Sequence, residues 1–185
     1  VNPLDGTQAV GVVVEDGANL LTTARWQIGA YSMDHAVAPS IPAPDTYVYA
    51  LGGLDGGGGA VIDAEGALVG ADGTLAAWVT VDNMNPARGG FGAIGANNFL
   101  LAIAGGDVLD DATPIGNSRS VPLCAAAGGT CEGGPPNLDN WNNDPATMIC
   151  NRYLMGIARE SATIFLIGGA ADDVGQPACI VMPDL

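Results

Sequence analysis

The sequence predicts an all-β protein built from short antiparallel strands. Glycine contributes 28 of the 185 residues and aromatic residues only 5%, which suits short strands and tight turns better than a helical bundle. Apolar residues make up 48% of the chain and gather in short runs bounded by Asn, Asp, Gly or Pro, as buried strands do. One pattern also occurs three times along the chain. At this length a single domain can bury a sizeable core.

The repeated pattern runs from a tryptophan to a glycine pair. The distance from the tryptophan to the first glycine is 26 or 27 residues, and a methionine follows each tryptophan after six or seven. An arginine precedes the pair by 16 or 17 residues in two copies, and His35 takes that place in the first. Such self-similarity indicates a repeat architecture. The repeat positions are Trp26, Trp78, Trp141, Gly52, Gly53, Gly105, Gly106, Gly168, Gly169, Arg88 and Arg152.

Four strands are expected in each unit. The runs before the glycine pairs are apolar and rich in β-branched or aromatic residues, which favours buried strands. A first strand precedes each run, a third follows the glycines, and a fourth carries the tryptophan. Asp-Gly within residues 71–73 favours a hairpin turn between the third and fourth strands. The runs are "TYVYAL", "FLLAIA" and "TIFLI", with "GGFGAIGA" and "RYLMGIA" before them, "GAVIDAEGAL", "SVPLCAAA" and "ACIVM" after them, and "TLAAWVTV" and "NLDNW" at the tryptophans.

These strands divide the single domain, residues 1–185, into four parts. Two complete units are expected at 33–81 and 87–143. Residues 8–28 are expected to supply the last two strands of another unit, and residues 152–182 the first three of a further one.

Four short strands in a unit of about 50 residues make up a blade of a β-propeller. The pattern resembles the kelch family, in which an apolar strand ends in Gly-Gly and a tryptophan lies on the outer strand, and its long units are similar to repeats of bacterial surface proteins. The resemblance covers nearly the whole chain and implies about three four-stranded blades. Because closed propellers typically have four to eight blades, we expect an incomplete ring, either part of a longer protein or completed by another chain.

The physical roles of the repeat positions agree with the resemblance. Gly-Gly at a strand end allows conformations and close approaches that a Cβ would block. A tryptophan of each unit is expected to fill the wedge between neighbouring blades. A methionine in the connection between units is expected to fill gaps.

The charge excludes two classes of partner. The formal net charge is -15, and all five basic residues are arginines. Nucleic acids and anionic membrane surfaces require a basic face, so neither is expected as a partner. No apolar stretch approaches the roughly 20 residues of a membrane helix, so no membrane span is predicted in this chain. The acidity favours solubility in an extracellular or salty setting.

The four cysteines indicate the cellular compartment in which the protein functions. Cys124 and Cys131 flank "AAAGGT", and no CxxC or histidine partner supports a zinc site. We expect a disulfide there, with two buried thiols as the alternative, and Cys150 and Cys179 are a further possible pair. A disulfide implies an oxidising compartment, so an extracellular, cell-surface or periplasmic location is predicted.

No catalytic or metal site is predicted. Ser32, Asp34 and His35 look like a triad, but neighbours in a strand point to opposite faces. A single histidine does not reproduce the copper site of the kelch-type oxidases that resemble galactose oxidase. Acidic loops follow the glycine pairs, but none has the spacing of an EF-hand. Solvated loops are expected there, with calcium as the alternative; their residues are Asp55, Asp107, Asp110, Asp111, Asp172 and Asp173.

The sequence therefore favours a non-catalytic binding or structural module of an exported or cell-surface propeller, with no cofactor and with a protein or glycan partner bound by its loops and blade faces. One alternative is a fragment of a propeller enzyme, carbohydrate-active or similar to galactose oxidase, whose catalytic residues lie outside this chain. Another is a structural subunit of a larger assembly, in which neighbours cap the open blade edges.

Overall fold

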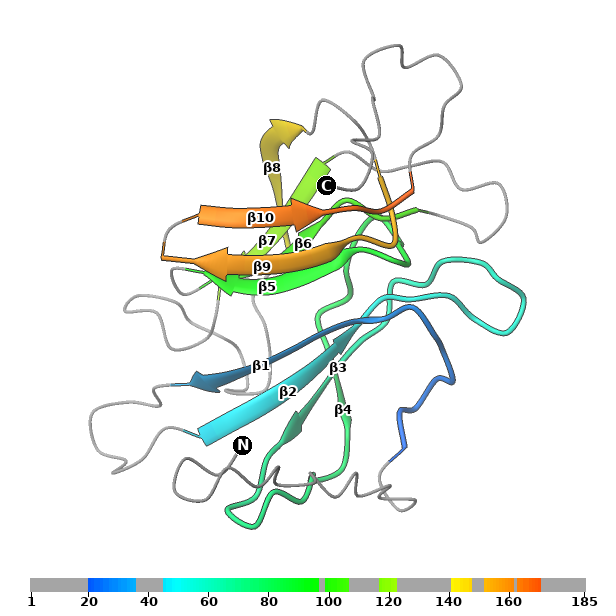
Figure 1. The fold of residues 1–185 in the computed structure, drawn as a ribbon. Coiled ribbons are helices and arrows are strands. Elements are labelled where there is room, and N and C mark those ends of the chain that lie inside the picture. The colour runs from blue at the N-terminus through cyan, green and yellow to red at the C-terminus, as the bar shows by residue number, and fades with distance from the viewer. Residues whose placement is uncertain are drawn as a thin grey trace, which may run out of the picture.

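The computed structural model describes residues 20–35, 45–96, 99–106, 117–122, 141–147, 152–161 and 163–170. All regular elements in these ranges are β-strands, arranged in three small antiparallel sheets (Figure 1). The prediction of an all-β fold is confirmed. The described ranges include no helix long and apolar enough to cross a membrane.

The first sheet is a four-stranded meander. Its strands lie in sequence order, and each is antiparallel to the next. The turn expected at residues 71–73 is present between its third and fourth strands, and Gly73 there has a φ of +83°. The strands are β1 (Gly29–His35), β2 (Asp45–Leu51), β3 (Ala64–Leu68) and β4 (Val79–Val81).

The second sheet repeats the same meander, and the third is a two-stranded hairpin. A register shift between Asn117 and Arg119 interrupts the last pairing of the second sheet. Its strands are β5 (Gly92–Ala96), β6 (Phe99–Ile103), β7 (Asn117–Pro122) and β8 (Asn142–Thr147). The hairpin consists of β9 (Gly156–Glu160) and β10 (Thr163–Ile167).

The strands before the glycine pairs form where they were predicted, whereas the observed bounds of the sheets differ from the predicted bounds of the units. The first sheet begins at residue 29 instead of 33, and the second covers 92–147 instead of 87–143. Residues 20–28 contain an isolated bridge but no strand, and residues 8–19 and 171–182 of the expected partial units lie outside the described ranges. The boundaries differ because Trp26 lies just before the first strand of its sheet, whereas Trp78 and Trp141 directly precede fourth strands.

The three sheets stack through their first strands, β1 against β5 and β5 against β9 (Figure 1). Glycines allow this close approach. A Cβ on Gly29 would lie 2.4 Å from Phe91 Cε2, and one on Gly95 would lie 2.4 Å from Tyr31 Cε1. The core between the first and second sheets includes Tyr49, Leu51, Met84, Phe91 and Leu100, and that between the second and third includes Ile94, Ile103, Met155, Ile157 and Leu166.

The buried Tyr49 makes stability sensitive to alkaline pH. Burial raises the pKa of this phenol well above its ordinary value of 10.0, and the neighbouring Tyr47 adds to the shift. Above about pH 10 the unfolded chain therefore loses a proton that the folded chain keeps, and stability falls as pH rises, by up to about 1.4 kcal/mol per pH unit. In denaturant titrations from pH 8 to 11, Tyr49→Phe should make this decline shallower. An unchanged decline would contradict the assignment.

Candidate functional site

A five-residue corner precedes the first strand of every sheet. Each corner starts with an arginine, and a glycine four residues later begins β1, β5 or β9. Its second residue forms an isolated bridge with the chain that leaves the second strand, so each corner closes one end of its sheet. The corners are "RWQIG" at 25–29, "RGGFG" at 88–92 and "RYLMG" at 152–156, and their bridges join Trp26 to Leu54, Gly89 to Gly106 and Tyr153 to Ala170.

The corner arginines donate hydrogen bonds to backbone carbonyls at this end of the sheet. Arg88 is fully buried, and its Nη1 lies 3.0 Å from the Ala104 carbonyl. Arg152 makes the same bond at 3.0 Å to the Gly168 carbonyl, in an exposed setting. The arginines thus tie the start of the first strand to the end of the second.

The chain leaving each second strand turns through two residues with positive φ. The pairs are Gly52–Gly53 (+50° and +109°), Ala104–Gly105 (+62° and +104°) and Gly168–Gly169 (+69° and +89°). Glycine adopts this conformation readily, which explains why glycine pairs recur here. In the second sheet the turn uses Ala104 and Gly105, so the Gly105–Gly106 pair is displaced by one residue from the other two.

The corners of neighbouring sheets are joined by backbone hydrogen bonds of one repeated kind. The amide of the second turn residue donates to the arginine carbonyl of the next corner, from Gly53 to Arg88 at 2.9 Å and from Gly105 to Arg152 at 3.0 Å.

A second series links the third residues of the corners, which all have positive φ. The Gly90 amide donates to the Gln27 carbonyl at 3.0 Å, and the Leu154 amide donates to the Gly90 carbonyl at 2.6 Å. The same two kinds of bond thus recur at both junctions between sheets.

The first corner arginine is Arg25, which the sequence comparison missed. His35, which took the arginine's place in that comparison, lies instead at the end of β1, paired with Asp45. The spacing from arginine to the glycine that begins the strand would have found Arg25, whereas the tryptophan spacing misaligned the first unit.

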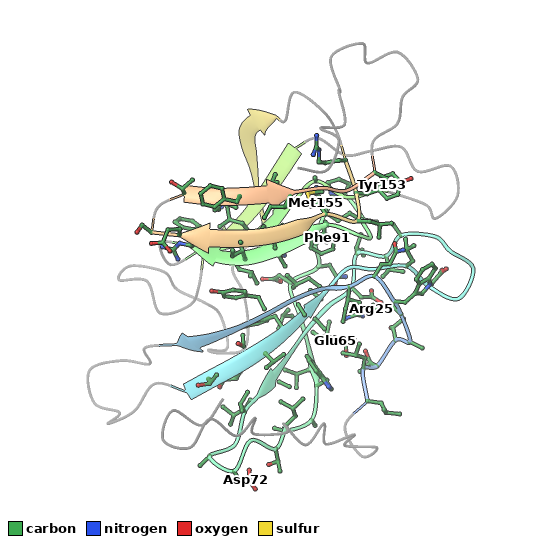
Figure 2. The ribbon with its side chains drawn as sticks, in the orientation of Figure 1. Arg25, Glu65, Asp72, Phe91, Tyr153 and Met155 are labelled. Carbon is green, nitrogen blue, oxygen red and sulfur yellow. The ribbon has the colours of Figure 1, made fainter. Side chains whose placement is uncertain are left out.

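Arg25 pairs with two acidic side chains. Its Nη1 lies 2.8 Å from Glu65 Oε1 and 3.8 Å from Asp63 Oδ2, and Nη2 donates to the Ala50 carbonyl at 3.1 Å. The second oxygen of Glu65 accepts from the Thr22 amide at 2.8 Å. Figure 2 shows Arg25 and Glu65 together on the first sheet. Because Glu65 is almost fully buried, the ion pair compensates a carboxylate that would otherwise destabilise the fold.

The three tryptophans occupy two kinds of position. Trp78 and Trp141 directly precede β4 and β8, consistent with the expected fourth strand. Trp141 packs against the core between the first and second sheets and donates from Nε1 to the Asp82 carbonyl at 3.0 Å. Trp141 thus contacts the core between neighbouring sheets, whereas Trp26 belongs to a corner and its residue surface is 41% exposed.

Trp26 and Asp55 shape a glycine-rich loop at the corner end of the first sheet. One Asp55 carboxylate oxygen accepts from the amides of Gly57 at 2.8 Å and Gly59 at 3.1 Å. The Trp26 indole donates to the Asp55 carbonyl at 3.1 Å. Aspartate thus orders an exposed loop beside an exposed indole.

Asp72 makes similar bonds at the opposite end of the same sheet (Figure 2). Its Oδ1 accepts from the amide of Thr74 at 3.1 Å and from its hydroxyl at 2.7 Å. These bonds stabilise the carboxylate and lower the pKa of Asp72 below its ordinary value. Asp55 and Asp72 are therefore comparable side chains at the two ends of one sheet.

The remaining predicted site residues divide between the described and undescribed parts of the chain. Ser32, Asp34 and His35, which the sequence does not predict to form a catalytic triad, are all in β1, and His35 is its last residue. In the described ranges, no three His, Cys, Asp or Glu side chains gather to form a potential metal site. Outside those ranges lie Asp107, Asp110, Asp111, Asp172, Asp173, Cys124, Cys131, Cys150 and Cys179.

Comparison of the chain with models of known protein families and with curated proteins found no match.

Proposed function

We propose that the three sheets are consecutive blades of a kelch-like β-propeller. The observation that carries the proposal is the repetition of one corner and of two inter-sheet hydrogen bonds at both junctions. Propeller blades are four-stranded antiparallel sheets arranged radially. The meander order of both four-stranded sheets and the packing of β1, β5 and β9 against one another fit such a stack.

The function that this architecture supports best is a non-catalytic binding or structural module. A rigid repeat scaffold holds loops at the ends of its sheets, and such loops commonly carry recognition. The partner is a protein or a glycan, and the setting is extracellular, cell-surface or periplasmic. The net charge of -15 supports this setting and disfavours nucleic acid as the partner.

The corner end of the sheets is the better candidate for the recognition surface. Three corners meet there, and the first carries the exposed indole of Trp26 beside the loop that Asp55 orders. An indole held by a hydrogen bond offers a large flat apolar face with little loss of conformational freedom on binding. Such a face suits a sugar ring or an apolar side chain of a partner.

Binding should depend on the Asp55 loop and not on the Asp72 turn. The chain would be tested against a glycan array and by chemical crosslinking to proteins of its native setting. We expect Trp26→Ala and Asp55→Ala to weaken the binding found there at least about tenfold, because they remove the aromatic face or release the loop that contacts it.

Asp72→Ala is the matched control, since it removes a comparable side chain from the opposite end of the sheet. Its affinity should equal that of the unaltered chain. The proposal fails if no protein or glycan is bound, or if the chain turns over a small-molecule substrate. Equal losses in all three variants would contradict recognition at the corner end.

A further inference from the structure

The outward face of the third sheet repeats a face that is covered in the other two. In each sheet the glycine that begins the first strand pairs with a large aliphatic residue of the second strand. These pairs are Gly29 with Leu51, Gly92 with Ile103, and Gly156 with Ile167. They lie at equivalent places because each is three residues from the bridge that closes its corner.

The burial of the aliphatic residue separates the third sheet from the others. Leu51 is 0% exposed and Ile103 9%, whereas Ile167 is 63% exposed. Phe165, on the same face of β10, is 48% exposed. The opposite face of β10 carries Ile164 and Leu166, which pack on the second sheet. The third sheet therefore presents an apolar face of the kind that the first two sheets bury.

The glycines on these faces point to the same difference. A Cβ on Gly29 would lie 2.4 Å from Phe91 of the second sheet, and one on Gly92 would lie 2.8 Å from Ile157 of the third. At Gly156 the nearest atom is the Ile167 carbonyl oxygen of the same hairpin, at 3.6 Å. Space that a neighbouring sheet fills at two junctions is thus open at the third.

The backbone groups that join neighbouring corners are also repeated. In the first two turns Gly53 and Gly105 donate to the arginine carbonyl of the next corner. Gly169 occupies their position in the third turn, with a φ of +89°. Its amide is therefore placed to donate to the arginine carbonyl of an additional corner. The Leu154 carbonyl is likewise placed to accept from the amide of that corner's third residue.

The corresponding face of the first sheet is open along its first strand. The entering faces of the second and third sheets present Ala93 opposite Ala102 and Ile157 opposite Leu166. The equivalent pair on the first sheet is Ala30, which is exposed, opposite Ala50, which is 2% exposed. First strands contact each other at both existing junctions, so the open part of this face is the part that a further junction would use.

We propose that the outward face of the third sheet binds the first sheet of a second copy of this chain, head to tail. Arg25 would offer its carbonyl to the Gly169 amide, and Gln27 its amide to the Leu154 carbonyl. The inference rests on the proposed propeller architecture. Two copies supply six sheets, of which the third in each copy is two-stranded in the described ranges, and closed propellers have about four to eight blades. A head-to-tail interface gives a closed assembly when its rotation completes a ring.

The mass in solution tests this assembly. Sedimentation velocity over a wide range of concentrations should show a dimer of twice the 18.5 kDa chain mass. Each chain carries a net charge of -15, so the copies repel each other. Added salt screens this repulsion, and dimerisation should therefore strengthen as ionic strength rises.

Two variants address the docking face itself. Gly156→Val adds bulk where the entering sheet must approach, and Ile167→Asp adds charge to the apolar face. Each should raise the dissociation constant of the dimer at least about tenfold. Ile62→Asp is the matched control, because Ile62 is a 41%-exposed isoleucine in the loop between β2 and β3. It should leave the dissociation constant unchanged.

Three outcomes would overturn the proposal. A monomer at every concentration and salt condition would mean that other residues of the chain, or a different partner, cover the face. Masses that grow without limit would exclude a closed pair. A dimer that both docking variants leave intact would place the interface elsewhere. Partner binding by the monomer would still support the proposed recognition function, so failure of the two proposals can be told apart.

Discussion

Arg88→Ala is expected to lower the free energy of unfolding by about 3 kcal/mol. Arg88 is fully buried, and its Nη1 donates to the Ala104 carbonyl at 3.0 Å. Alanine removes this donor and leaves a cavity between the corner and the turn. The measurement is urea denaturation, in which the midpoint should fall while the slope stays constant.

Arg152→Ala is the matched control for the buried arginine. Arg152 starts the third corner and makes the equivalent bond to Gly168, also at 3.0 Å. Its bond is exposed, so water can replace the lost donor, and we expect a loss below about 1 kcal/mol. Equal losses in the two variants would show that burial of the corner does not determine the contribution of its arginine.

Arg88→Met separates the two parts of the expected loss. Methionine restores apolar volume near the side-chain stem but provides no donor for the Ala104 carbonyl. Its stability should lie between that of the unaltered chain and that of Arg88→Ala. A variant as stable as the unaltered chain would show that the hydrogen bond to Ala104 contributes nothing measurable.

Gly29→Ala is expected to lower the free energy of unfolding by about 1–3 kcal/mol through overpacking. The new Cβ would lie 2.4 Å from Phe91 Cε2 and 2.9 Å from Ala93 Cβ. Phe91 is buried between the first and second sheets, so it cannot move without disturbing that core. The same denaturation experiment measures the effect, at protein concentrations low enough to keep the chain monomeric.

The equivalent glycines of the other sheets provide a graded series. Gly92→Ala should cost less than Gly29→Ala, because its closest contact is Ile157 Cδ1, the flexible end of a side chain. Gly156→Ala should leave the monomer unchanged or stabilise it by up to about 1 kcal/mol, since its closest contact, at 3.6 Å, is ordinary. Equal losses at the three positions would mean that an intrinsic preference for glycine, and not the neighbouring sheet, determines the effect.

The strand pattern could be predicted from local sequence. The apolar runs at 46–51, 99–104 and 163–167 become β2, β6 and β10 to within one residue at each end. The hairpin turn at 71–73 also forms where Asp-Gly occurs. These features depend on residues close together in the chain, where apolar content and backbone preference act directly.

Local sequence predicts the corners only in part. Arg88 and Arg152 are repeat positions, but the tryptophan spacing places His35, and not Arg25, at the corresponding position of the first unit. The sequence also does not predict that the turn of the second sheet uses Ala104 and Gly105 instead of the glycine pair Gly105–Gly106, because alanine seldom has positive φ. Hydrogen bonds between separate segments determine which residues turn, and those bonds form only when the sheets pack.

The sequence by itself determined that this chain forms short antiparallel strands in repeated units, because residue type and the spacing of apolar residues determine the local conformation of the backbone. Only the tertiary structure decided what each repeated residue does. Arg88 and Arg152 start similar corners, and Gly29 and Gly156 begin equivalent strands. Their environments differ because the exposure of each residue depends on whether another sheet packs against its own.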